Sequence, residues 1–115
     1  MPAASKLSAL DRLKKAANLA PIKKIVTLSD GSEFVFYHTP LTMAEREYAQ
    51  KGNGDDLNAF ALQLLVNKAM DENGQRLFAA GHIAELKNEV RDADLQALML
   101  AVITDDKQEE TDLKN

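Results

Sequence analysis

Residues 56–103 decide the fold of this chain, beginning with DLNAFALQLLVNKA (56–69) and ending with DADLQALMLAVI (92–103). In both segments the apolar residues recur at i, i+3, i+4, i+7 and i+8, the spacing of a helix with one buried face. The predicted faces consist of Leu57, Phe60, Ala61, Leu64, Leu65 and Ala69 in the first helix, and Leu95, Leu98, Met99, Val102 and Ile103 in the last. A shorter stripe lies between them at Ile83, Leu86 and Val90. Because each stripe must be covered by another, the sequence predicts a small helical cluster.

Two runs rich in β-branched and aromatic residues precede this cluster and predict a β-hairpin with strands at 22–28 and 33–38. Asp30-Gly31 between them favours a type I′ turn, which needs positive φ at both central residues. Phe34 and Phe36 fall on one face of the ribbon, while Val35 and Tyr37 fall on the other. We therefore expect an α+β fold that is predominantly helical, with one N-terminal hairpin packed on about four short helices.

Capping signals place the helix boundaries. Thr42 and Glu45 form a capping box that predicts a helix running from there to about residue 51. The glycines of the segment 51–54 end it, and Asp55 or Asp56 caps the next helix. Asp92 and Asp94 precede the last helix, where carboxylates cap free amides and favour the positive end of the helix dipole.

No arrangement of residues indicates catalysis, a metal or a cofactor. The acidic segment DENGQ (71–75) lacks the glycine and glutamate positions of a calcium loop, so a tight turn is expected there, followed by a short extended piece at 76–78. His38 and His82 belong to different predicted elements, and the chain has no cysteine. We therefore expect no enzyme, no cofactor and no metal site.

Length and charge divide the chain into three parts. The 115 residues suffice for one domain, which the apolar pattern places at 22–104. Residues 1–21 form a basic leader, expected to be helical or mobile, and 105–115 an expected disordered acidic tail. Residues 1–24 carry a net charge of +5, which leaves −9 for the remainder of a chain with net −4. A solvated leader, self-association or other protein partners, and an anionic nucleic acid are three interpretations of this asymmetry. No apolar run is long enough to span a membrane, so we expect a cytoplasmic protein.

The order of segments resembles the tail assembly chaperones of long-tailed, siphophage-type bacteriophages. The resemblance covers about residues 22–104 and rests on a basic leader, a short hairpin ending in FYH (36–38), PLT (40–42) opening an ERE helix, FALQLLVNKA (60–69), DENG (71–74), RLF (76–78), IAELKNEV (83–90) and ADLQ (93–96).

The resemblance implies a non-enzymatic virion assembly factor of the host cell cytoplasm that is absent from the mature virion. Such proteins bind the tape measure protein and keep it soluble until the tail tube forms. Many are made in two lengths by ribosomal frameshifting, and the longer product recruits the tail tube protein. This chain is then expected to be the short product, and a homo-oligomer would add avidity on a long client.

Partner contacts are expected where the helices carry more apolar residues than one buried face requires. Leu62 and Val66 lie on another side of the first helix from Leu64 and Leu65, and Leu100 lies off the face of the last helix. These three residues are either a client-binding surface or a secondary core. The alternative function is a small DNA-binding or regulatory helical module with a helix-turn-helix whose turn falls at 90–93. The acidic residues of the last helix argue against it.

Overall fold

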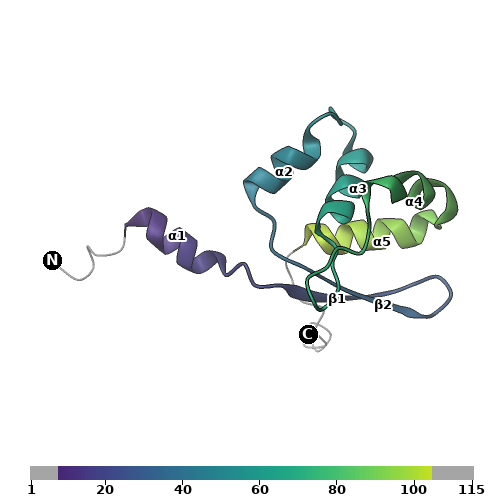
Figure 1. Ribbon diagram of the computed structural model, residues 1–115, viewed down its shortest axis with the longest axis horizontal. Coiled ribbons are helices and arrows are strands. Elements are labelled where there is room, and N and C mark those ends of the chain that lie inside the picture. The colour runs from purple at the N-terminus through teal and green to yellow at the C-terminus, as the bar shows by residue number, and fades with distance from the viewer. Residues whose placement is uncertain (1–7, 105–115) are drawn as a thin grey trace, which may run out of the picture.

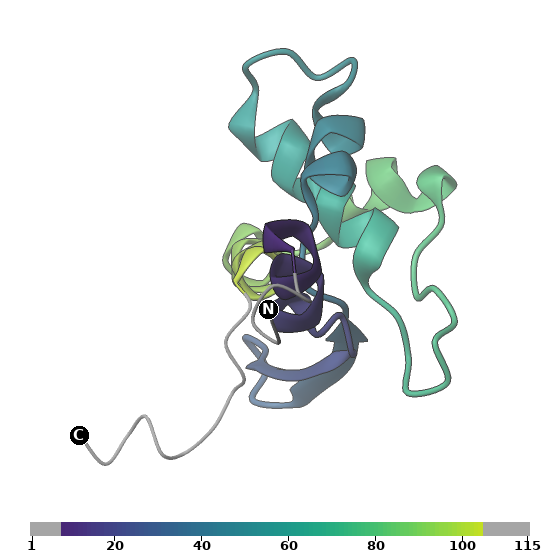
Figure 2. The ribbon, with the colours of Figure 1, turned by 90° about the vertical axis from the view of Figure 1, so that its left-hand side faces the viewer.

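A computed structural model of the protein describes residues 8–104 and has the expected α+β fold. Its elements are α1 (Ala9–Ala17), β1 (Ile22–Thr27), β2 (Glu33–His38), α2 (Met43–Gln50), α3 (Leu57–Lys68), a short 3-10 helix (Ala80–His82), α4 (Ile83–Glu89) and α5 (Asp92–Ile103). The hairpin lies on one side of α5, and α2 and α3 lie on the other (Figures 1 and 2). No helix between residues 8 and 104 combines the length and the apolar character needed to cross a membrane.

The predicted capping residues begin α2 and α3 where the sequence places them. The Thr42 hydroxyl accepts the amide of Glu45, and the Glu45 carboxylate accepts the amide of Thr42, which completes the capping box of α2. Asp56 caps α3 by accepting the amide of Ala59 at 3.0 Å. Gly52 and Gly54 adopt positive φ in the connection from α2 to α3, as expected for a helix stop. The chain therefore leaves α2 and enters α3 at the predicted places.

The hairpin turn differs from the predicted type I′ turn. Gly31 has a φ of 89°, whereas Asp30 is not among the described residues with positive φ. The Gly31 amide donates to the Leu28 carbonyl at 2.9 Å, and the Leu28 amide donates to the Ser32 carbonyl at 2.8 Å. These bonds define a three-residue loop in which only the third residue is left-handed, so one glycine is sufficient.

A strand-like segment covers the outer edge of β2. Tyr37 exchanges both backbone hydrogen bonds with Met70, at 2.8 and 2.9 Å, and Met70 also bridges to Arg76. In the predicted extended piece 76–78, Arg76 forms this bridge and Leu77 is a bend, and Phe78 stacks on Phe34 with ring centroids 6.4 Å apart. The outer edge of β2 is therefore paired at Tyr37, while β1 forms the other edge of the ribbon.

Helix α3 is the centre of the core and is not the one-faced helix that its spacing predicts. It packs against both α2 and α5. Its buried residues cover more than half of the helix circumference: Leu62, Leu64, Leu65, Val66 and Lys68. Leu57, by contrast, belongs to the predicted face but is exposed, as is Ile103 at the end of α5. Contacts with two neighbouring helices bury more than one face of α3, so the period alone does not identify its core side.

The body of the fold contains every buried residue among those described, from Lys24 to Val102. Helix α1 begins at its N-cap Ser8 and has no buried residue. It extends away from the body (Figure 1). The predicted acidic tail at 105–115 and the first seven residues of the leader lie outside the described residues.

Candidate functional site

An open groove of about 360 Å³ lies between α3, α4 and α5. Its apolar lining comes from all three helices and consists of Ala59, Leu62, Ile83, Leu95 and Met99. Its polar lining consists of Asn53, Asp56, Asn58, Gln63, Lys87, Asp92 and Gln96. An apolar floor with a polar rim is the usual construction of a surface that receives the apolar side of a helix.

The three residues predicted to contact a partner separate in the structure. Leu62 is 6% exposed and lies in the floor of the groove. Val66 is fully buried in the core, so its prediction as binding surface is wrong. Leu62 is likewise core and not a free surface residue, because the three-helix packing covers all but the groove side. Leu100 is 63% exposed, as expected for a residue off the buried face of α5.

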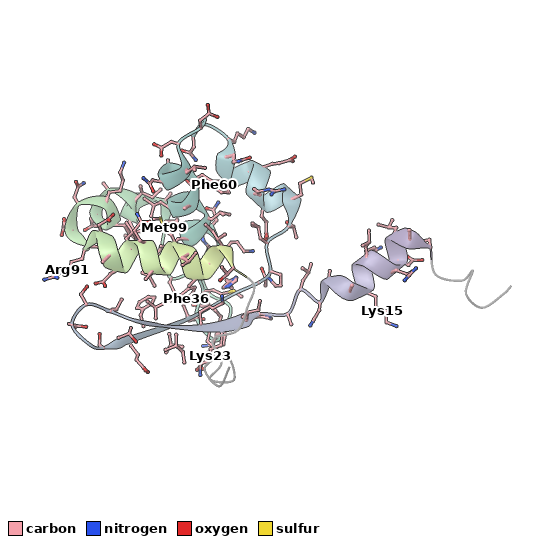
Figure 3. All side chains as sticks on the ribbon, turned by 180° about the vertical axis from the view of Figure 1, so that it is seen from behind. Lys15, Lys23, Phe36, Phe60, Arg91 and Met99 are labelled. Carbon is pink, nitrogen blue, oxygen red and sulfur yellow. The ribbon has the colours of Figure 1, made fainter. Side chains whose placement is uncertain are left out.

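Leu100 continues the side of α5 that lines the groove. The lining residues Asp92, Leu95, Gln96 and Met99 recur at helical spacing, and Leu100 follows Gln96 by four residues. Residues four apart are neighbours on a helix surface. The exposed Leu100 therefore lies one turn beyond Gln96, at the rim of the groove. Figure 3 shows Met99 on α5 in the part of the molecule that also carries Arg91.

Helix α1 carries the second exposed apolar surface. Leu10 and Leu13 lie on one side of this helix and Arg12 and Lys15 on the other, and both leucines are more than 60% exposed. The sequence signalled this stripe through its i, i+3 spacing and its basic flank. What the sequence did not supply was a covering element: in the described residues, α1 has none.

Two buried lysines hold the fold together and lie outside the groove. The Lys24 ammonium donates to the carbonyls of Ala101 and Thr104, each at 2.9 Å, at the C-terminal end of α5. Lys68 donates to the Thr39 hydroxyl at 2.9 Å and forms an ion pair with Glu45 at 2.7 Å. Lys24 was counted in the net charge of +5 of residues 1–24, but its side chain points inward from β1 and caps a helix. One of the positive charges of that segment is therefore buried.

The Glu45 carboxyl has a lowered pKa because two effects oppose each other and the second prevails. Partial burial raises its pKa, whereas hydrogen bonds from Lys68 and from the Thr42 backbone, with the charge of Lys68, lower it. The pair joins α2 to α3 beside a shallower pocket that includes Tyr48 and Arg76. Its evident role is to fix α2 on the core.

The remaining polar candidates have structural partners. The prediction that Asp92 or Asp94 caps the last helix is wrong: both lie within the first turn of α5, and its N-cap Arg91 has no side-chain capping bond. The Asp94 carboxylate instead accepts from the amide and hydroxyl of Ser29 at 2.8 and 2.7 Å. This contact ties the hairpin turn to α5. His82 accepts the Ala79 amide at 3.0 Å, and His38 Nδ1 lies 2.9 Å from the Thr39 carbonyl. Within residues 8–104, no group of three or more potential metal ligands occurs.

Comparison with protein-family models, with curated proteins and with solved structures found no match to this chain. The groove and the exposed leucines therefore carry the functional argument.

Proposed function

We propose that this protein is a non-enzymatic tail assembly chaperone, and that its groove binds an apolar stripe of the helical tape measure protein to keep it soluble. The observation that carries the proposal is the open groove between α3, α4 and α5 and its continuation to the exposed Leu100. The family assignment itself rests on the order of sequence segments described above.

The lining chemistry suits a client that presents many similar but unequal apolar stripes. Met99 in the floor is flexible and polarisable, and methionine adapts to partners of varied shape. Ile83 and Leu95 supply apolar area, while Gln63 and Gln96 at the rim offer hydrogen bonds without a fixed charge. A helix that places residues at i, i+3, i+4 and i+7 into such a groove needs no reacting group.

The wider family properties belong to the same proposal. They are production as the short form of a frameshifted gene, recruitment of the tail tube protein by the longer form, action in the host cell cytoplasm and absence from the mature virion. No specific observation favours the alternative function, a DNA-binding module. Helix α5 contains no lysine or arginine to contact phosphates, and five of its residues are buried.

Co-expression with the tape measure protein tests the proposal, with soluble tape measure protein as the measurement. Leu100→Asp should reduce the soluble fraction sharply, because an exposed contact leucine is worth about 1.5–3 kcal/mol when covered. Leu57→Asp is the matched control, since Leu57 is also exposed and is not among the groove-lining residues. Circular dichroism of both variants checks the fold.

Two results would overturn the proposal in different ways. If the parent protein leaves the tape measure protein insoluble, the function is wrong. If the parent solubilises it and Leu100→Asp and Gln96→Lys do so equally well, the function stands and the groove is not the client site.

A further inference from the structure

Helix α1 has an exposed apolar stripe that is typical of a helix covered by a partner surface. Nine residues form a marginal helix in water, since helices shorter than about 12–15 residues are rarely stable alone. Leu10 and Leu13 project from one side with Ala17, Arg12 and Lys15 project from the other, and Lys14 flanks Leu10. Exposure of such a stripe to water is unfavourable, and covering it with an apolar surface lowers the free energy.

The same molecule does not place α1 over its own groove. The helix ends at Asn18 in the left-handed conformation, with a φ of 41°, and Pro21 then restricts the chain before β1. Figure 3 shows Lys15 at one end of the molecule and Arg91 at the other, with Met99 on the Arg91 side. The exit geometry thus directs α1 away from the groove.

The groove of another molecule offers both the apolar floor and the opposite charge. Helix α1 has three basic residues and one acidic residue, a net of +2. Residues 25–104 contain twelve acidic and six basic residues, a net of −6. At the groove itself Asp56 and Asp92 outnumber Lys87. Charges of opposite sign steer association and are screened over about 8–10 Å at ordinary salt.

We propose that α1 of one copy docks into the groove between α3, α4 and α5 of a second copy. Leu10 and Leu13 cover the floor around Leu62 and Met99, and Lys14, which flanks Leu10 on the helix surface, lies beside Asp56 and Asp92. The contact joins two different surfaces, so it is heterologous, and each added copy still presents a free α1 or a free groove. The assembly therefore does not stop at a dimer.

The docked α1 occupies the same groove as the proposed client stripe, but its docking is tested with the protein alone. Sedimentation velocity of the full chain over a range of concentrations should show species larger than a dimer. The fraction of protein in these species should fall as the salt concentration is raised. Leu10→Gln with Leu13→Gln should weaken association by about a hundredfold or more, because each leucine forfeits burial worth a factor of about ten or more. Met43→Gln, at an exposed residue of α2, is the control and should associate like the parent.

Gln96→Lys places a positive charge at the groove and should weaken association from the other side, whereas Gln50→Lys at the end of α2 should not. The decisive measurement is a mixture. The α1 variant retains a groove and the Gln96→Lys variant retains α1, so together they should form a one-to-one complex and nothing larger.

Three results would overturn the proposal. One is a parent protein that is monomeric at every concentration, which is also what docking of α1 onto its own body would give. Another is association of both variants at the parental strength, which pairing through the β1 edges would give. The third is a mixture that forms no one-to-one complex. Each of these results is obtained without the tape measure protein, so a failure of α1 docking is distinguished from a failure of client solubilisation.

Discussion

The ammonium of Lys24 is the clearest point at which one buried side chain holds two parts of the fold together. Lys24 lies on β1 and is 1% exposed. It donates to the carbonyls of Ala101 and Thr104 at 2.9 Å and to the Thr104 hydroxyl at 3.0 Å. These carbonyls are at the end of α5, where no further helical amide can reach them and a positive charge is favourable. Lys24→Met keeps the length of the side chain and removes all three bonds.

We expect Lys24→Met to reduce the free energy of unfolding by about 2–3 kcal/mol. Hydrogen bonds that involve a charged group are worth about 1.5–3 kcal/mol each. The net loss of stability is smaller than the sum of these hydrogen bonds, because the variant no longer has the cost of burying an ammonium group. The Thr104 hydroxyl lies 3.3 Å from the Ala101 carbonyl and still offers it a partner, so the Thr104 carbonyl bears most of the loss.

Urea unfolding and thermal melting measure the change. A domain of this size loses about 4–8 °C in Tm per kcal/mol, so a fall of about 10–20 °C is expected. Lys23→Met is the matched control, because Lys23 is the neighbouring residue on the exposed face of β1. Amide exchange at 102–104 should also become faster in the Lys24 variant. If the two variants differ by less than about 0.5 kcal/mol, the capping argument is refuted.

Two further predictions concern the turn and the ion pair. Gly31→Ala should cost about 1 kcal/mol or more in unfolding free energy, because Gly31 has positive φ, whereas Gly81→Ala, without positive φ, should change it little; equal melting temperatures would contradict this. The Glu45 pKa is lowered on folding, so the stabilisation by Glu45 is complete above the ordinary glutamate pKa of about 4.3 and lost as the pH falls through the lower folded value. Urea unfolding of Glu45→Gln should therefore differ from the parent most at neutral pH and least in acid, with Glu47→Gln as the exposed control; a difference that persists unchanged in acid would exclude this role for the Glu45–Lys68 pair.

Local signals in the sequence determined most of the elements. The caps at Thr42 and Asp56 bond to backbone amides within a few residues, and the glycines after α2 adopt positive φ. These are local features, so the neighbouring residues in the sequence suffice to predict them. The hairpin strands were predictable for the same reason, because alternation is a local property. The turn type was not, since Asp30-Gly31 is compatible with more than one loop and the strand pairing selects between them.

Tertiary packing decided which apolar residues became surface. Leu62 and Val66 are buried and Leu57 is exposed because α3 is covered from two sides along its C-terminal half, which depends on where α2 and α5 pack against it. Helical period reports the faces of a helix but not the number of its neighbours. The partners of Lys24 and Asp94 lie 77 and 65 residues away along the chain, so their roles follow from the fold alone. The groove arises in the same way, since its lining from α3, α4 and α5 meets only once these helices pack.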